Sequence, residues 1–384
     1  MKLRLLVPLL IAVLFFQPAF GQEAPAHKFL LTGFGFTNME KEENQGAQYE
    51  IGFNPIFLWS INNRILFEGD LEFELEDGGT AVALEYAQIL YVFNNYFTFG
   101  AGKFLSPNNI FFERLHPAWI NKMPTLPLGM TGHGGVQLLA TTQLGLQARG
   151  GIPAGSSRFA YSLYVSNGPA LNVEAEEEGG HEDEGEGEGD GHGSVSANGT
   201  LNFDNIPDNN DDKAVGGRIS FIPIPELEIG YGIESARVGT DGTPFSDVKS
   251  LNNVVDLAFV KDIGALKGRL DFRGQYVWLN VDNPGEHPLE FENNSKAGYA
   301  QLAYQPSGAS SPFLKNIELV GRYDQLDLPK EAAINIDQKR IALGLNYWLN
   351  HSSIFKFAFE SVTSEHEDEK ETESKFIFQF AMGF

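Results

Sequence analysis

The last ten residues of the chain constrain its fold most strongly. From Lys375 to Phe384 one set of alternating positions is large and apolar, namely Phe376, Phe378, Phe380, Met382 and Phe384. The positions between them include Lys375 and Gln379. A period of two indicates a β-strand with two different faces. A face with four phenylalanines needs a large apolar partner such as a lipid bilayer, and the strand structure that a bilayer admits is a closed β-barrel.

The beginning of the chain predicts export. Lys2 and Arg4 precede an apolar run over 5–16, and small residues stand at 19 and 21. This pattern predicts a signal peptide over 1–21 and a mature chain over 22–384. No later run reaches the roughly 18 apolar residues of a spanning helix, so any membrane span must be made of strands.

Composition excludes several classes of function. The chain has no cysteine, which excludes disulfides, thiol catalysis and cysteine-bound metal. Its formal net charge is −24, which argues against nucleic acid as a partner because phosphates would be repelled. No Gly-x-Ser-x-Gly or His-Glu-x-x-His motif and no phosphate-binding glycine loop is present. We therefore expect a protein that is not an enzyme.

Alternating segments separated by turn residues predict sixteen strands. They lie near 27–37, 47–58, 64–76, 80–93, 95–103, 143–152, 158–167, 214–222, 226–237, 252–261, 266–280, 295–305, 315–326, 338–348, 353–363 and 374–384. Connections alternate between short turns and longer loops, and an even count leaves both termini on one side. The pattern predicts an all-β fold, a single antiparallel transmembrane β-barrel of about 16 strands. The alternative is a soluble protein with several sheets, whose strands also alternate.

The two faces of individual strands indicate which side meets lipid. Over 64–76 one face carries Glu68, Asp70, Glu72 and Glu74, whereas the other carries mainly Ile, Phe and Leu. Charged side chains on the inner face require water, because dry burial would cost several kcal/mol per ion. A water-filled lumen inside about 16 strands is wide enough for a pore.

The third long connection, 104–142, is predicted to fold into the lumen as a constriction loop. It is rich in Phe and Trp, which an extracellular loop should not expose to water. Its polar residues Glu113, Arg114, His116 and Lys122 would then stand at the narrowest point and select solutes. In the alternative, Glu113 and Arg114 form a pair that only anchors the loop.

Charges on the wall are predicted to line the pore on opposite sides. Besides the carboxylate row on the third strand, basic residues occur on later strands, namely Arg149, Arg158, Arg218, Lys267, Arg269 and Arg273. The third and eleventh strands are eight apart in sixteen, so they would face each other and set up a transverse field. The alternative is that these charges pair locally between neighbouring strands.

The loop 169–213 is acidic and of low complexity, which predicts a disordered extracellular segment. His181, Glu182, Asp183, Glu184 and His192 offer carboxylate and imidazole ligands for weak binding of a divalent cation. Their spacing follows no fixed ligand pattern, so a solvated fringe that attracts cations is the alternative. No other cofactor is expected.

Two resemblances support the barrel. The final strand resembles the C-terminal strand of Gram-negative outer-membrane β-barrels, which implies that Phe384 is read by the barrel assembly machinery. The segments 318–328, 340–350 and 161–169 resemble the phosphate-selective porin O/P family. That resemblance implies a 16-stranded trimeric porin with an inward third loop and with anions passing along rows of Arg and Lys. The acidic loops and the carboxylate row of this chain depart from that pattern.

The sequence thus predicts an outer-membrane porin, located among lipid and lipopolysaccharide after export through the periplasm. It would pass small hydrophilic or ionic solutes passively, and the resemblance adds anions such as phosphate. The alternative is an outer-membrane binding barrel whose acidic, histidine-containing loops capture a divalent metal or a partner.

Overall fold

The computed structural model describes residues 28–43, 46–76, 79–130, 136–175, 195–204, 206–282, 289, 293–329, 337–366 and 369–384. The predicted signal peptide, 1–21, lies outside these residues, as does the most acidic stretch, 176–194.

All sixteen predicted strands are present, and they form one closed barrel, which confirms the predicted fold class. The strands are β1 (Lys28–Glu42), β2 (Gln48–Ser60), β3 (Ile65–Glu76), β4 (Gly79–Asn94), β5 (Phe97–Leu105), β6 (Thr142–Ala154), β7 (Ser157–Ser166), β10 (Ala214–Ile224), β11 (Leu227–Arg237), β12 (Lys249–Ile263), β13 (Gly268–Asp282), β14 (Asn293–Gln305), β15 (Ile317–Asp327), β16 (Asp337–Asn350), β17 (Ser353–His366) and β18 (Glu369–Gly383).

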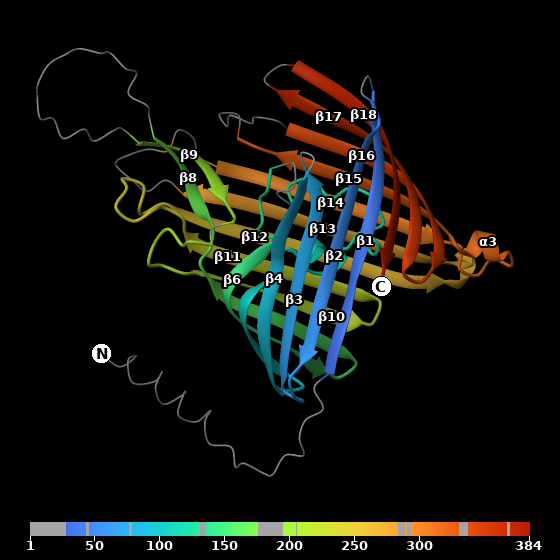
Figure 1. Ribbon diagram of the computed structural model, residues 1–384, viewed down its shortest axis with the longest axis horizontal. Coiled ribbons are helices and arrows are strands. Elements are labelled where there is room, and N and C mark those ends of the chain that lie inside the picture. The colour runs from blue at the N-terminus through green and yellow to red at the C-terminus, as the bar shows by residue number, and fades with distance from the viewer. Residues whose placement is uncertain are drawn as a thin grey trace, which may run out of the picture.

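Antiparallel pairing with the nearest neighbour builds the barrel, and the first and last strands close it. β1 pairs with β18 from Phe34 opposite Gly383 to Glu42 opposite Lys375. Figure 1 shows these two strands side by side. Along the closed sheet, β3 and β13 lie eight places apart, so they stand on opposite walls as predicted.

The barrel is apolar outside and polar inside. On β16 the side chains of Ile341 and Leu343 are 57% and 59% exposed, whereas Arg340 and Asn346 on the alternate positions are 5% and 0% exposed. This arrangement is the inverse of a soluble protein, in which the large apolar side chains face inward. An apolar outer face suits strands that lie against hydrocarbon.

The connections differ between the two rims, which we call the turn end and the loop end. At the turn end the links are short, one of them the 3-10 turn η1 (Gly264–Leu266), except for 306–316, which contains the helix α3 (Pro312–Lys315). Lys267 lies in this turn with a left-handed φ of 50°. The prediction that Lys267 belongs to the wet face of a strand is therefore wrong, because the chain is still reversing there.

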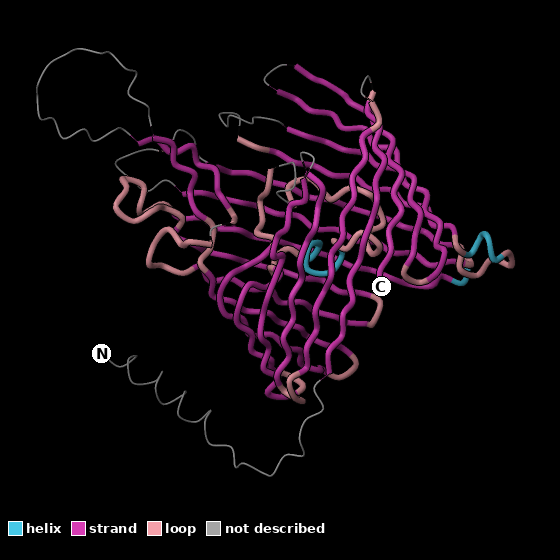
Figure 2. Tube along the Cα trace, in the orientation of Figure 1, coloured by secondary structure: helices cyan, strands magenta, loops and turns pink. Residues whose placement is uncertain are grey.

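Helical structure is sparse, as Figure 2 shows. Besides α3, the helix α2 (Ile110–Leu115) lies within the long connection between β5 and β6. Within the described segments, no helix combines the length and the apolar character needed to cross a membrane.

The loop 169–213 is more ordered than predicted at its two ends. The strands β8 (Ala170–Ala175) and β9 (Val195–Asn202) form a separate two-stranded sheet at the loop end. Leu171 is buried, and its backbone N–H donates to the oxygen of Val238. Local apolar contacts therefore override the polar composition at this point.

Candidate functional site: the barrel interior

The connection 106–141 is held against the inner wall by hydrogen bonds. The Asn109 side chain caps α2 through the N–H of Phe112 and also donates to the oxygen of Met130 at 2.7 Å. The N–H of Phe111 donates to the side chain of Gln275 on β13 at 3.1 Å. Because Gln275 belongs to the inward set of β13, this segment contacts the inside of the barrel.

A second group of contacts holds residues 118–126 against β15–β18. Lys356 is completely buried, and its Nζ donates to the backbone oxygens of Ala118 and Met123 and to Gln379. Lys122 forms an ion pair with Glu318 on β15. Buried charges require such partners, since an isolated ion in an apolar interior costs several kcal/mol.

Next to these contacts lies a buried four-charge cluster, made of Arg322, Asp324, Arg340 and Glu360. Arg322 and Arg340 approach Asp324 at 3.1 and 2.9 Å and Glu360 at 3.8 and 3.5 Å. Arg322 also donates to the backbone oxygen of Thr125 at 2.8 Å. Sequence reasoning missed this cluster. The alternation of residues predicts which side chains face inward. Whether these four side chains meet depends on the strand register, which the alternation does not predict.

Part of the inner wall that the connection covers, on β12–β14, is apolar. Val254, Val277 and Leu279 face inward from β12 and β13 and pack with Leu138 of the connection. The approach is close, because a Cβ on Gly129 would lie 2.5 Å from the Cβ of Ala297. The inference of a charged wall therefore fails for the loop-end half of β12–β14.

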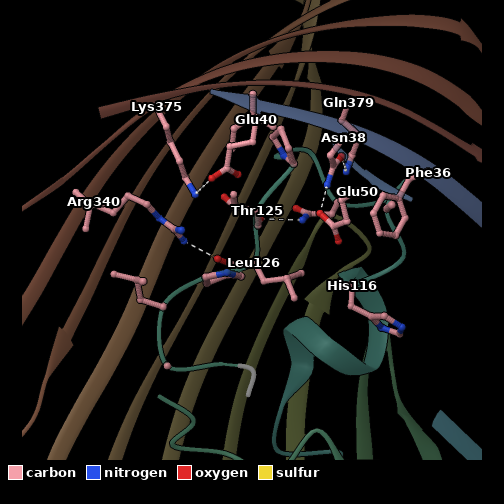
Figure 3. A pocket seen from close by; sticks show the side chains of 18 of the residues that line it. Phe36, Asn38, Glu40, Glu50, His116, Thr125, Leu126, Arg340, Lys375 and Gln379 are labelled. Carbon is pink, nitrogen blue, oxygen red and sulfur yellow. Dashed lines mark hydrogen bonds and ion pairs between the residues drawn. The ribbon is translucent and has the colours of Figure 1, made fainter. Parts of the chain in front are cut away.

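A cavity of about 560 Å³ is lined by the connection and by side chains of β1–β3 and β15–β18. We call this cavity the vestibule. Figure 3 shows it, with Arg340 directed at the backbone of Leu126 and Lys375 directed at Glu40; the Lys375 Nζ lies 2.8 Å from the Glu40 carboxylate. Its charged lining residues are Glu40, Glu42, Glu50, Glu72, Glu74, Glu373, Arg340 and Lys375. His116 also lines it.

The four carboxylates of the predicted acidic row on β3 lie in different environments. Glu72 and Glu74 line the vestibule. Glu68 accepts a hydrogen bond from Gln88 at 2.9 Å. Asp70 is only 1% exposed, so it does not present its carboxylate to a passing solute.

A second cavity, of about 430 Å³, lies against the side of the connection that carries Glu113 and Arg114. Arg149 and Arg218 line it as well. Arg114 pairs with Glu113 at 3.2 Å and with Glu228 at 3.1 Å, so the predicted anchoring pair is present.

The other predicted basic residues are dispersed. Arg218 is buried, and it pairs with Asp256 at 2.6 Å and Glu228 at 2.9 Å. Arg158 is exposed near the turn end of β7 and does not line the second cavity.

A third cavity, of about 350 Å³, contains the remaining predicted residues Lys122, Arg269 and Arg273. Arg273 pairs with Asp271 at 2.7 Å, and Lys122 lies 3.8 Å from the same carboxylate. The four polar residues predicted for one narrow point, Glu113, Arg114, His116 and Lys122, thus face three different cavities.

The predicted metal ligands His181, Glu182, Asp183, Glu184 and His192 lie outside the described residues. Within the part of the chain that the structure describes, no group of three or more His, Asp or Glu side chains is placed to hold a metal.

A closed barrel with an apolar exterior and charged cavities inside has the architecture of membrane channels of the porin type. Comparison with protein-family models gave no match, and comparison with curated protein sequences gave none either. The fold itself is similar to solved outer-membrane barrels.

Three solved structures illustrate this similarity. The anion-selective porin from Comamonas acidovorans has a TM-score of 0.57 at 10% identity, over 94% of this chain and 100% of that chain. Outer-membrane expressed OmpT of Vibrio cholerae has a TM-score of 0.55 at 12% identity, over 95% of this chain and 99% of that chain. Salmonella typhi OmpF has a TM-score of 0.54 at 11% identity, over 93% of this chain and 98% of that chain. The TM-scores show a shared fold, and at such low identities the similarity shows the fold alone.

Proposed function

We propose that the protein is an outer-membrane porin, a passive water-filled channel for small hydrophilic or ionic solutes. The observation that carries this proposal is the inverted barrel wall, with exposed Ile341 and Leu343 alternating with buried Arg340 and Asn346. The names of the similar structures, an anion-selective porin among them, support it.

In this proposal the connection between β5 and β6 is the constriction loop. It is attached to the inner wall at Gln275, Glu318 and Lys356, and cavities border it on both sides. A segment attached at several points of the wall can narrow the lumen without blocking it, because cavities remain beside it.

Export and assembly in the outer membrane are part of this proposal. The predicted signal peptide would direct the mature chain through the periplasm to the outer membrane of a Gram-negative bacterium. Phe384 would be the signal for the barrel assembly machinery, and lipid and lipopolysaccharide would surround the barrel. We propose a homotrimer, since one similar structure, in-vitro folded OmpT of Vibrio cholerae, is a trimer form.

We further propose that the solutes that pass the channel include anions, phosphate among them. Arg149 and Arg269 line the second and third cavities, and neither has a hydrogen bond or ion pair among the described residues. Such side chains would attract a passing anion. The reversal potential measured in a salt gradient tests this proposal, because its sign shows whether anions or cations pass more readily.

The channel is tested by planar-bilayer recording of the purified mature chain. Discrete and steady conductance steps are expected, because the cavities hold charged side chains that require water. A matched control is a chain that ends before residue 369, which lacks β18 and cannot close the barrel. Silence of the intact, folded chain would contradict the channel and favour a binding barrel.

A further inference from the structure

The three cavities differ in the sign of their charge. In the vestibule, six glutamates stand against Arg340 and Lys375, an excess of four negative charges. In the second cavity, Arg114 and Arg218 are paired with Glu113, Glu228 and Asp256, whereas Arg149 has no ion-pair partner among the described residues and supplies the positive charge. In the third cavity, Lys122, Arg269 and Arg273 stand against two carboxylates, which leaves one further positive charge.

The positions of these residues along their strands place the cavities at different depths. Glu40 and Glu74 stand two residues before the loop-end limits of β1 and β3. Arg269 and Glu318, by contrast, are the second residues of β13 and β15, counted from the turn end. Thr98, which lines the second cavity, is likewise the second residue of β5 from the turn end. The acidic cavity therefore lies toward the loop end and the other two toward the turn end.

The connection between β5 and β6 forms the boundary. Asn121 lines both the vestibule and the third cavity, whereas Arg114 faces the second. A solute that crosses the lumen past this segment meets an acidic zone and then a basic zone.

We infer that the channel rectifies ion current, because fixed charges of opposite sign are placed in series along the lumen. This inference rests on the proposed channel function. When the loop end is positive, cations move out of the acidic zone and anions move out of the basic zone, so both accumulate at the boundary and conductance rises. The opposite polarity removes both ions from the boundary, and conductance falls.

The arrangement also differs from a purely transverse field. Opposed rows at one depth would change which ion passes but would act equally in both directions. Series placement distinguishes the two directions, and its effect must fade with salt because mobile ions screen fixed charge.

The test is single-channel recording in planar bilayers under symmetrical salt. In 0.1 M salt, where the Debye length is about 10 Å, currents at opposite voltages should differ by about two-fold or more. In 1 M salt, where the Debye length is about 3 Å, the ratio should approach one. The magnitude of the ratio is read from single insertions, so the orientation of each insertion does not matter.

Two paired variants locate the cause. Glu72→Gln with Glu74→Gln weakens the acidic zone, and Arg149→Gln with Arg269→Gln weakens the basic zone. Both should lower the ratio toward one, yet they should shift ion selectivity in opposite directions, the first toward anions and the second toward cations. The control, Asp204→Asn with Asp247→Asn, also removes two charges, but from exposed loop positions, and should leave both readings unchanged.

The outcomes separate the inference from the channel proposal. A wild-type channel that conducts equally in both directions at 0.1 M salt overturns the inference and leaves the channel intact. Rectification that survives both paired variants also overturns it. A folded protein that never conducts overturns the channel proposal itself.

Discussion

At the scale of single residues, buried charge is the distinctive feature of the inner wall. Arg322, Asp324 and Glu360 have fully buried side chains, and Arg340 is nearly so. Two arginines share two carboxylates, so each ion has more than one partner. Breaking such a cluster leaves an uncompensated charge, which costs more than the loss of an exposed pair.

Arg322→Met should therefore destabilise the barrel by about 3–5 kcal/mol, because two carboxylates would then share one arginine. The matched control is Lys261→Met, which removes an ion pair with Glu226 whose side chains are 46% and 35% exposed. Its cost should stay below about 1 kcal/mol. Urea unfolding of the micelle-bound barrel measures both, and equal losses would show that burial of the cluster adds nothing.

At the scale of elements, the connection between β5 and β6 depends on the wall for its position. Lys356 binds two of its carbonyl oxygens, Arg322 binds Thr125, and Gln275 binds the N–H of Phe111. These hydrogen bonds fix where the connection lies on the wall, and its own hydrogen bonds, such as that from Leu138 N–H to the oxygen of Gly129, shape it internally.

Lys356→Met should loosen residues 118–123. Hydrogen bonds to charged groups contribute about 1.5–3 kcal/mol each, enough to change the attached population by more than ten-fold. We expect noisier current and a larger mean conductance in single-channel recordings. Lys370→Met, at an exposed position on β18, serves as the control. Identical traces for wild type and Lys356→Met would contradict the role of this lysine.

The strands could be predicted from the sequence, but the side-chain contacts inside the barrel could not. Period-two alternation located all sixteen strands, because each one has an apolar outer face. The same period could not reveal that Val277 and Leu279 face inward under a covering segment. It also could not reveal the cluster around Arg322, since that depends on which residues of β15, β16 and β17 stand opposite each other.

The candidate site was predicted in its parts but not in its arrangement. Glu113 and Arg114 pair as one alternative predicted, yet His116 and Lys122 face different cavities. Lys267 lies in the turn and not on the strand, because the turn extends two residues further than the alternation suggests. Side-chain direction within an irregular segment has no period, so composition alone could not fix it.

At the scale of the whole molecule, the proposed channel depends on one property, a wall with hydrocarbon outside and water inside. Phe73 and Leu343 would face lipid, whereas Glu72 and Glu74 would face the water of the vestibule. Every proposal above requires this inverted wall.

The chain has no cysteine, so single cysteines can report each position separately. The decisive measurement is the rate at which a charged, water-soluble thiol reagent labels Cys variants at 72, 73, 74 and 343 in reconstituted bilayers. The account predicts fast labelling at Glu72→Cys and Glu74→Cys and protection at Phe73→Cys and Leu343→Cys. Fast labelling at the two outer positions, or equal rates at all four, would contradict it.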